Sequence, residues 1–267
     1  MSVKGRKMSF NTVGFTILGI PPYFFCAVVG LVAAVCLNII LVSSKKYCLK
    51  EHMRVLIISI ISMMVLAKLF GCISGAYRAI GVGELITFDT IKNTGIVFYG
   101  GLFGLLLAYY CGIKSRLITV KDPHAMDVLA VCIPLFHAIA RTGCFLAGCC
   151  YGIESNIFAI RYTMMDDRVV NTANRIPVQL IEALYNIGLF FYLFICIRKD
   201  GWENKNLLLR YIMFYSCGRF LLEFIRGDTV RGVIYGVSFS QMISIIIWLT
   251  IFIYIIKNKS KAKENDV

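Results

Sequence analysis

The sequence predicts an all-α fold: a polytopic integral membrane protein of about seven transmembrane helices packed in one bundle. Of the 267 residues, 58% are hydrophobic and 16% are charged, whereas a soluble domain is roughly half apolar and a quarter charged. Seven apolar runs are long enough, or nearly so, to cross a ~30 Å hydrocarbon core, which takes about 20 residues. In lipid the backbone must satisfy its own hydrogen bonds, so we expect these runs to be helices.

The seven runs follow one another without an internal repeat or a low-complexity tract. They are expected near Pro22–Val42, Val55–Tyr77, Gly95–Gly112, Met126–Phe145, Val178–Ile197, Leu207–Phe224 and Val237–Ile256. The start of the chain is polar and basic, and the apolar run that follows is too long for a cleavable signal peptide. We therefore expect a single transmembrane domain over residues 1–267, with a short basic tail at residues 257–267.

The distribution of lysine and arginine predicts the orientation of the bundle. If the C-terminus is cytoplasmic, more of the 28 basic residues fall in cytoplasmic segments than in outer ones, as the positive-inside rule requires. We therefore expect the N-terminus outside and the C-terminus in the cytoplasm, although the basic N-terminal tail runs against the rule. The net charge of +13 then reflects topology and attraction to anionic membrane lipids. Nucleic-acid binding is disfavoured, because the chain has no soluble basic domain.

Five ionisable residues lie inside the predicted spans, and this orientation puts all of them in the outer half of the membrane. They are Lys68, Arg141, Glu182, Arg219 and Glu223, and Tyr99 is expected at the same depth. An ionisable group in a bilayer costs roughly 2.5–3.5 kcal/mol on insertion scales, so each one is a hypothesis for function. Arg219 and Glu223, taken alone, also fit a structural i,i+4 pair. Two arginines facing a cavity suit a phospholipid phosphate, because guanidinium forms paired bonds to phosphate oxygens.

The stretch ARTGCFLAGCCYG, residues 140–152, closes the fourth predicted span. Its glycines let the backbone approach another backbone or a ligand, and those after Phe145 predict a loop or a broken helix. Its cysteines, Cys144, Cys149 and Cys150, have three chemical alternatives: a soft-metal site, a redox pair or a nucleophile. Their spacing is not C-x-x-C and no histidine is adjacent. This favours small residues in a tightly packed turn, so we expect no metal ion and no cofactor.

Several blocks of the sequence resemble one known family. The pattern R-x-G-x-F-x-x-G-x-x-x-G, formed by Arg141, Gly143, Phe145, Gly148 and Gly152, resembles the signature of the bacterial prolipoprotein diacylglyceryl transferases. FYGGLFG (98–104), PVQLIEALYN (177–186), YSCGRFLLEFIRGD (215–228) and GVSFSQMISI (236–245) resemble further blocks of that family in the same order. The resemblance extends from about Gly19 to Trp248.

The resemblance implies an enzyme of the bacterial cytoplasmic membrane with its active site toward the outer leaflet. It would transfer an sn-1,2-diacylglyceryl group from phosphatidylglycerol to the lipobox cysteine thiol of an exported preprolipoprotein, releasing glycerol 1-phosphate. Arg141, Arg219 and Tyr99 would be catalytic, with the two arginines holding the departing phosphate. Substrate binding would involve Glu223, Tyr215, Glu182, Gln179, Gly143, Gly152 and Lys68.

The chain departs from the family pattern at three positions. The histidine of the family's H-G-G block is Tyr99, the asparagine after R-x-G is Cys144, and the acidic residue three before the last glycine is Cys149. Tyrosine, with a pKa near ~10, is a poor base at neutral pH. His137, one turn before Arg141, fits a core histidine and could also replace the missing base. Transfer to a different acceptor and non-catalytic phospholipid binding or transport therefore stay open.

Overall fold

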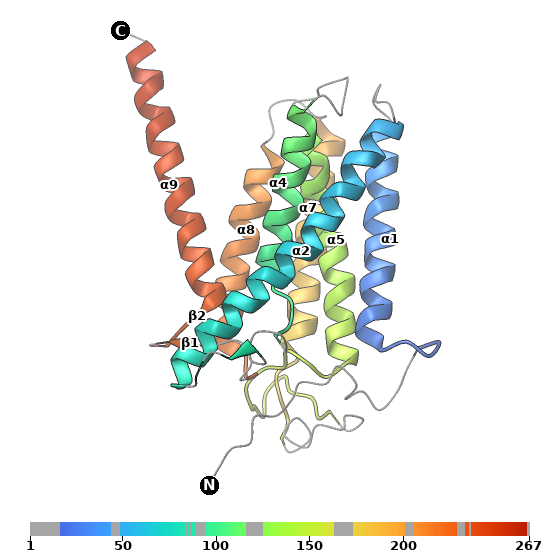
Figure 1. Cartoon of the computed structure of the whole chain (residues 1–267), viewed down its shortest axis with the longest axis vertical. Helices are drawn as coiled ribbons and strands as arrows, with labels where there is room; N and C mark the ends of the chain where they lie inside the picture. The colour runs from blue at the N-terminus through green and yellow to red at the C-terminus, as the bar shows by residue number, and fades with distance from the viewer. Residues whose placement is uncertain are drawn as a thin grey trace.

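The computed structural model describes residues 17–43, 49–83, 85, 87–88, 94–115, 125–162, 173–200, 206–228, 233–234 and 236–265. In these residues, seven α-helices form one bundle (Figure 1). They are α1 (Pro22–Ser43), α2 (Leu49–Val82), α4 (Phe98–Lys114), α5 (Ala125–Leu146), α7 (Val178–Asp200), α8 (Leu207–Leu222) and α9 (Phe239–Asn265). The predicted all-α, polytopic fold is confirmed. The N-terminal tail before residue 17, residues 163–172 of the loop that follows the fourth predicted span, and the side chains of residues 257–267 lie outside the described part.

The segment after α8 contains a short helical turn and a short hairpin that were not predicted. A turn of 3-10 helix, η1 (Glu223–Ile225), continues α8, and two strands of two residues each, β1 (Val233–Ile234) and β2 (Val237–Ser238), pair in antiparallel fashion. The last helix was expected from Val237 but begins at Phe239. This hairpin is too short for its sequence to alternate visibly between polar and apolar residues.

Four helices are long and apolar enough to cross a membrane by themselves: α1, most of α2, α5 and most of α7. A shorter apolar helical run, Phe239–Tyr254, belongs to α9. The other two, α4 and α8, have 17 and 16 residues. At ~1.5 Å per residue they are about 24–26 Å long, slightly less than the hydrocarbon core.

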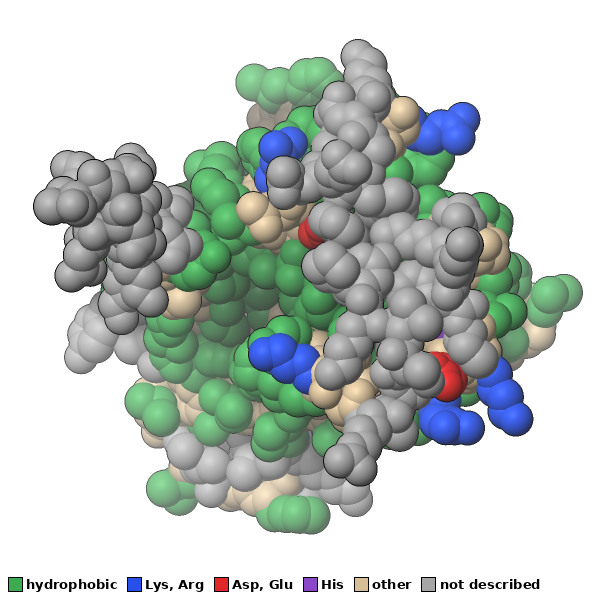
Figure 2. Space-filling view, turned by 90° about the horizontal axis from the view of Figure 1, so that it is seen from above, with side chains coloured by type: hydrophobic (Ala, Val, Ile, Leu, Met, Phe, Trp, Pro, Cys, Tyr) green, Lys and Arg blue, Asp and Glu red, His purple; other side chains and the backbone are tan. Residues whose placement is uncertain are grey.

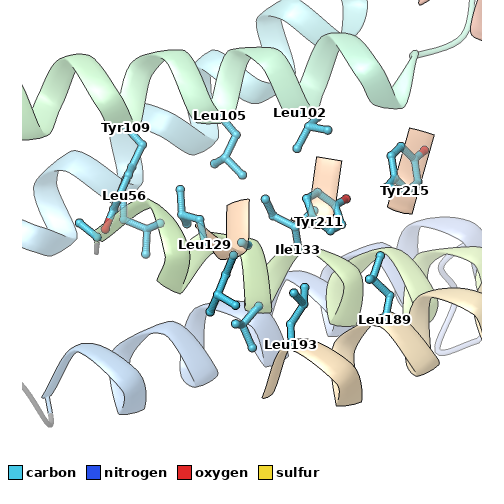
Figure 3. Close-up of a cluster of buried hydrophobic side chains, with 14 of the residues drawn as sticks. Leu56, Leu102, Leu105, Tyr109, Leu129, Ile133, Leu189, Leu193, Tyr211 and Tyr215 are labelled. Atoms are coloured by element: carbon cyan, nitrogen blue, oxygen red, sulfur yellow. The ribbon is translucent and has the colours of Figure 1, made fainter. Parts of the chain in front are cut away.

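Helix α5 occupies the centre of the bundle. Its most apolar window is 67% buried, against 22–33% for the other three long helices, and it contacts α1, α7, α8 and α4. Figure 3 shows the main core, where Leu129 and Ile133 of α5 lie among Leu102, Leu193 and Tyr211 of the surrounding helices. Large apolar side chains on the outer surface, which a soluble protein would bury, are exposed on most helices. This surface fits contact with lipid.

Small residues allow α4 to lie close against α2. An added Cβ at Gly100 would come within 2.5 Å of the Leu66 carbonyl oxygen, and one at Gly104 within 2.6 Å of the Ser62 carbonyl oxygen. A side chain at either position would push the helices apart. This contact fixes the start of α4, where Tyr99 is located.

Candidate functional site

Four of the predicted charged residues come together at one end of the bundle. Arg141 lies in the last two turns of α5, Glu182 near the start of α7, Arg219 in the last turn of α8, and Glu223 opens η1. Glu182, Glu223 and Arg219 are 2%, 2% and 5% exposed. Each of these residues lies near the end of its helix that faces the same end of the bundle. Residues distant in sequence therefore form one charged cluster.

Glu182 is the centre of the first group of contacts. One carboxylate oxygen accepts a hydrogen bond from Nη2 of Arg141 at 3.1 Å. The other oxygen lies 2.9 Å from Nε of Arg141, an ion-pair contact. The same carboxylate lies 3.5 Å from Nε2 of His137. The His137 ring stacks on Phe98, with ring centroids 3.8 Å apart. One acidic residue thus positions an arginine and a histidine that are one helical turn apart on α5.

Arg219 forms the second group of contacts. Its Nη1 is 2.6 Å from a carboxylate oxygen of Glu223, the i,i+4 partner expected from the sequence. Its Nη2 donates to the hydroxyl of Ser240 at 3.1 Å. One turn further along α9, the hydroxyl of Ser244 is 2.7 Å from that of Tyr99. Arg219 also acts electrostatically on Glu182, so the two groups of contacts adjoin.

A cluster of aromatic rings lies beside the charged groups. Tyr215 is 5.1 Å from Phe98, 5.3 Å from His137 and 5.5 Å from Tyr99, measured between ring centroids. The hydroxyls of Tyr215 and Tyr211 are buried and have no hydrogen-bond partner among the described residues. Buried polar groups are nearly always paired in proteins. The free Tyr215 hydroxyl, next to two arginines, is therefore a candidate contact for a bound headgroup.

Gln179 holds the loop that follows α5. Its side-chain nitrogen donates to the carbonyl of Cys149 at 2.6 Å, and its oxygen accepts from the hydroxyl of Tyr162 at 3.0 Å. Burial raises the pKa of Tyr162 to about 12, so this phenol stays protonated and can donate. Gln179 was predicted to bind substrate, and its observed contacts are with protein. These two bonds fix the shape of the loop, and substrate binding by Gln179 stays a prediction.

Two glycines predicted to bind substrate also have close contacts with protein. An added Cβ at Gly143 would lie 2.6 Å from Cβ of Cys26 in α1, and one at Gly152 would lie 2.5 Å from the carbonyl oxygen of Ile176. Gly152 also donates its N–H to that carbonyl at 3.0 Å. Both glycines bring backbones together, so they shape the site whether or not they touch a ligand.

The three cysteines near the end of α5 also converge. The sulfur atoms of Cys144, Cys149 and Cys150 lie within 4.8 Å of one another, and Nη1 of Arg141 is 3.9 Å from the Cys144 sulfur. Hydrogen bonding among the three thiols lowers the pKa of Cys150 well below its usual range and raises that of Cys149 well above it, so one proton is held more tightly than another in the group. This group joins the charged cluster through Arg141.

Lys68 is the most exposed of the predicted charged residues, and several other residues near the site were not predicted. Lys68 is exposed and donates to the carbonyl of Thr94, in the segment before α4, at 2.6 Å. Arg226, which follows η1, was not among the predicted site residues, yet it is buried and donates to both carboxylate oxygens of Asp228 at 2.8 and 2.7 Å. The i,i+2 charge pair was the only signal for it. The four-residue spacing of Ser240 and Ser244 in an apolar helix could have indicated that they share one polar face.

The cluster is chemically suited to hold an anion. Each guanidinium carries five N–H donors in a planar fork, and Glu182 engages those of Arg141 on one edge. The remaining donors of Arg141 and Arg219 can bind phosphate oxygens with charge-assisted bonds. The carboxylates keep the buried arginines paired before an anion arrives, since an unpaired buried charge is strongly unfavourable.

Comparison with known proteins covers most of the chain. Residues 12–257 match the family described as prolipoprotein diacylglyceryl transferase. The chain is 27% identical over 249 residues to phosphatidylglycerol–prolipoprotein diacylglyceryl transferase 2 of Clostridium perfringens, covering 92% of this chain and 94% of that one. It is 29% identical over 202 residues to the transferase of Clostridium tetani, covering 73% and 79%. It is 28% identical over 249 residues to the transferase of Streptococcus pneumoniae, covering 92% of each.

Proposed function

Because the chain belongs to the prolipoprotein diacylglyceryl transferase family, we propose that it transfers a diacylglyceryl group from phosphatidylglycerol to the lipobox cysteine of an exported preprolipoprotein. Glycerol 1-phosphate is the second product. The reaction takes place in the bacterial cytoplasmic membrane, with the site toward the outer leaflet. The observation that carries this proposal is the buried cluster of Arg141, Glu182, Arg219 and Glu223, since it offers two oriented guanidinium groups at one end of a membrane bundle.

The proposed reaction exchanges one bond for another at the sn-3 carbon of the lipid. The acceptor sulfur, as thiolate, forms a C–S bond with this carbon, and the carbon–oxygen bond to the phosphate breaks. The electron pair leaves with glycerol 1-phosphate, whose phosphate gains negative charge. Arg141 and Arg219 stabilise that charge as it develops, and donors preorganised in a water-poor site act most strongly there. Tyr215 contributes its free hydroxyl to the headgroup.

The surface around α9 supports access for a two-chain lipid. Helix α9 packs against α8 near its start and leans away from it further along (Figure 1). Seen from the end where α9 finishes, a hollow lined by hydrophobic side chains separates α9 from the rest of the bundle (Figure 2). Leu249, Phe252 and Ile253 are exposed on α9. Acyl chains can lie against such a surface while the headgroup reaches the arginines.

The contacts of Tyr99 favour a hydrogen-bonding role for this residue. Tyr99, in the first turn of α4, is buried, and its hydroxyl is 2.7 Å from the hydroxyl of Ser244 in α9. A neutral phenol can donate to a headgroup oxygen but is a poor acceptor for a thiol proton at neutral pH. The base supplied by histidine in the family pattern must therefore come from elsewhere. The replacement of histidine by Tyr99 also favours the second candidate function. In that case the protein transfers the lipid-derived group to a different acceptor, or binds the phospholipid without transferring it.

Mass spectrometry of a synthetic lipobox peptide, incubated with purified protein and phosphatidylglycerol, tests the proposal. We expect the peptide to gain the mass of one diacylglyceryl group, and a peptide with serine in place of cysteine to gain nothing. A related transferase, run under the same conditions, serves as the positive control. If the control modifies the peptide and this protein does not, the proposal is wrong. Saturable lipid binding in that case would favour the second candidate.

A further inference from the structure

The three cysteines beside Arg141 form a cluster for which the arginine chemistry gives no role. Cys144 lies in the last turn of α5 and is buried, and Cys149 and Cys150 lie in the following turn and are half-buried. All three are free thiols whose sulfur atoms lie within 4.8 Å of one another. We infer that Cys144, Cys149 and Cys150 bind one zinc ion, and that its fourth ligand position takes the thiol of the acceptor cysteine.

The geometry of the sulfur atoms fits a three-thiolate site. Zinc binds thiolate sulfur at about 2.3 Å in tetrahedral geometry, which places ligand sulfurs about 3.8 Å apart. Sulfurs already within 4.8 Å reach that spacing by side-chain adjustments of about 1 Å or less. Thiolate is a soft ligand that selects zinc over magnesium or calcium. Catalytic zinc sites typically have three protein ligands and one open position.

The backbone around the cluster is fixed by contacts other than the thiols. The N–H of Cys149 donates to the carbonyl of Cys144 at 3.2 Å, and the carbonyl of Cys149 accepts from Gln179 at 2.6 Å. Cys150 has a φ of +60°, which is uncommon for a residue other than glycine. This left-handed turn carries two neighbouring cysteines back toward the helix end. The ligands are therefore held together before a metal ion binds, which lowers the ordering cost of binding.

The surrounding charge suits such a site. Three thiolates on a divalent cation leave one net negative charge, and Nη1 of Arg141 lies 3.9 Å from the Cys144 sulfur. Nearby arginines favour the thiolate form of cysteine. Arg141 also binds Glu182. One guanidinium thus connects the thiol cluster with the proposed phosphate site.

The inferred role deepens the proposed function and rests on it. Binding to zinc as the fourth ligand releases the proton of the acceptor thiol to solvent and keeps the sulfur as thiolate at neutral pH. That sulfur then forms the C–S bond to the glyceryl carbon as the bond to the phosphate oxygen breaks. The product is a thioether, a much weaker ligand, and it dissociates. Zinc changes no oxidation state, and no histidine is needed where Tyr99 stands.

Cobalt is a suitable probe, because it takes the place of zinc and absorbs visible light. We expect purified, reduced full-length protein to bind one zinc or cobalt ion per chain, with a sulfur-to-cobalt charge-transfer band. Adding the lipobox peptide should shift the visible cobalt bands, and the serine peptide should not. Cys149→Ser and Cys150→Ser should each weaken metal binding by more than the ~10–100-fold typical of losing an outer-sphere contact. Cys132→Ser, which alters another buried thiol of α5, should bind metal normally.

The outcomes separate the two proposals. A folded protein without bound metal or a sulfur-to-cobalt band overturns the zinc site, as does unchanged binding in Cys149→Ser with a normal unfolding temperature. If chelator-treated protein modifies the peptide at an unchanged rate, the inferred role is wrong and the proposed function stands. If cobalt binds and responds to the cysteine peptide but no diacylglyceryl group is transferred, the site stands and the proposed function fails.

Discussion

At the scale of single residues, Glu182 determines how the site is organised. Its carboxylate contacts Arg141 through two oxygens and also reaches His137. A buried ion pair of this kind adds little net stability, because removing both charges from water costs about as much as their attraction returns. The main effect of the Arg141–Glu182 pair is to hold the guanidinium of Arg141 in one orientation toward a ligand.

Arg141→Lys tests this orientation. Lysine keeps the positive charge but has one compact ammonium group in place of the planar guanidinium. It cannot contact both oxygens of Glu182 and two oxygens of a phosphate at the same time. We expect turnover of the lipobox peptide to fall about 100-fold, as when one transition-state donor is removed. Arg210→Lys, at an exposed arginine of α8, is the matched control and should retain full activity. Equal turnover in both variants would exclude the proposed role of Arg141.

Tyr215→Phe separates ligand binding from stability. The Tyr215 hydroxyl is buried and bonds to no described protein group, so its removal should leave the unfolding temperature unchanged or raise it. The apparent KM for phosphatidylglycerol should rise about tenfold, the loss of one hydrogen bond of ~1–1.5 kcal/mol. Tyr162→Phe is the comparison, because that hydroxyl donates to Gln179, and it should lower stability by about 1 kcal/mol. A Tyr215→Phe variant that is destabilised with unchanged KM would show a structural role only.

At the scale of helices, the location of each helix in the sequence was more predictable than the residues at which it begins and ends. Apolar runs located all seven helices, because lipid requires continuous helical segments. The predicted fourth span, Met126–Phe145, differs from α5 by one residue at each end. Helix α2, by contrast, extends from Leu49 to Val82, beyond the apolar run at both ends. A helix ends where its backbone hydrogen bonds are capped, so hydropathy alone does not mark where α2 begins or stops.

The contact between α1 and α5 is the element-scale feature with the clearest test. Gly143→Ala should destabilise the protein by about 1–3 kcal/mol, the usual cost of overpacking, because the new Cβ would be 2.6 Å from Cβ of Cys26. Gly188→Ala in α7 is the control, since nothing lies within 4 Å of an added Cβ there. Thermal unfolding in detergent measures both. Similar unfolding temperatures for the two variants would contradict the tight packing at Gly143.

At the scale of the whole molecule, part of the site followed from topology and part did not. Alternating helix directions were enough to predict that Arg141, Glu182 and Arg219 meet at one end. The same reasoning predicts that Lys68 lies at this end as well, and Lys68 is exposed and donates to the carbonyl of Thr94. Depth in the membrane is readable from sequence, but the direction in which a side chain faces around its helix depends on packing. The convergence of the three sulfur atoms likewise depends on the turn at Cys150, which spacing does not reveal.

The orientation in the membrane is a prediction for the whole chain. The excess of basic residues on one side predicts a cytoplasmic C-terminus. We expect a C-terminal green fluorescent protein fusion to fluoresce and alkaline phosphatase inserted after the exposed Phe158 to be active in cells. An active phosphatase at the C-terminus would reverse the orientation and place the arginine cluster at the cytoplasmic side.

The central claim is that the arginine cluster transfers the diacylglyceryl group and releases the phosphate in the same reaction. The most direct measurement quantifies both products from one incubation of protein, phosphatidylglycerol and lipobox peptide. The account predicts equal amounts of diacylglyceryl peptide and glycerol 1-phosphate, and both should fall together by about 100-fold in Arg141→Lys. Glycerol 1-phosphate without modified peptide, or neither product from folded, lipid-bound protein, would contradict it.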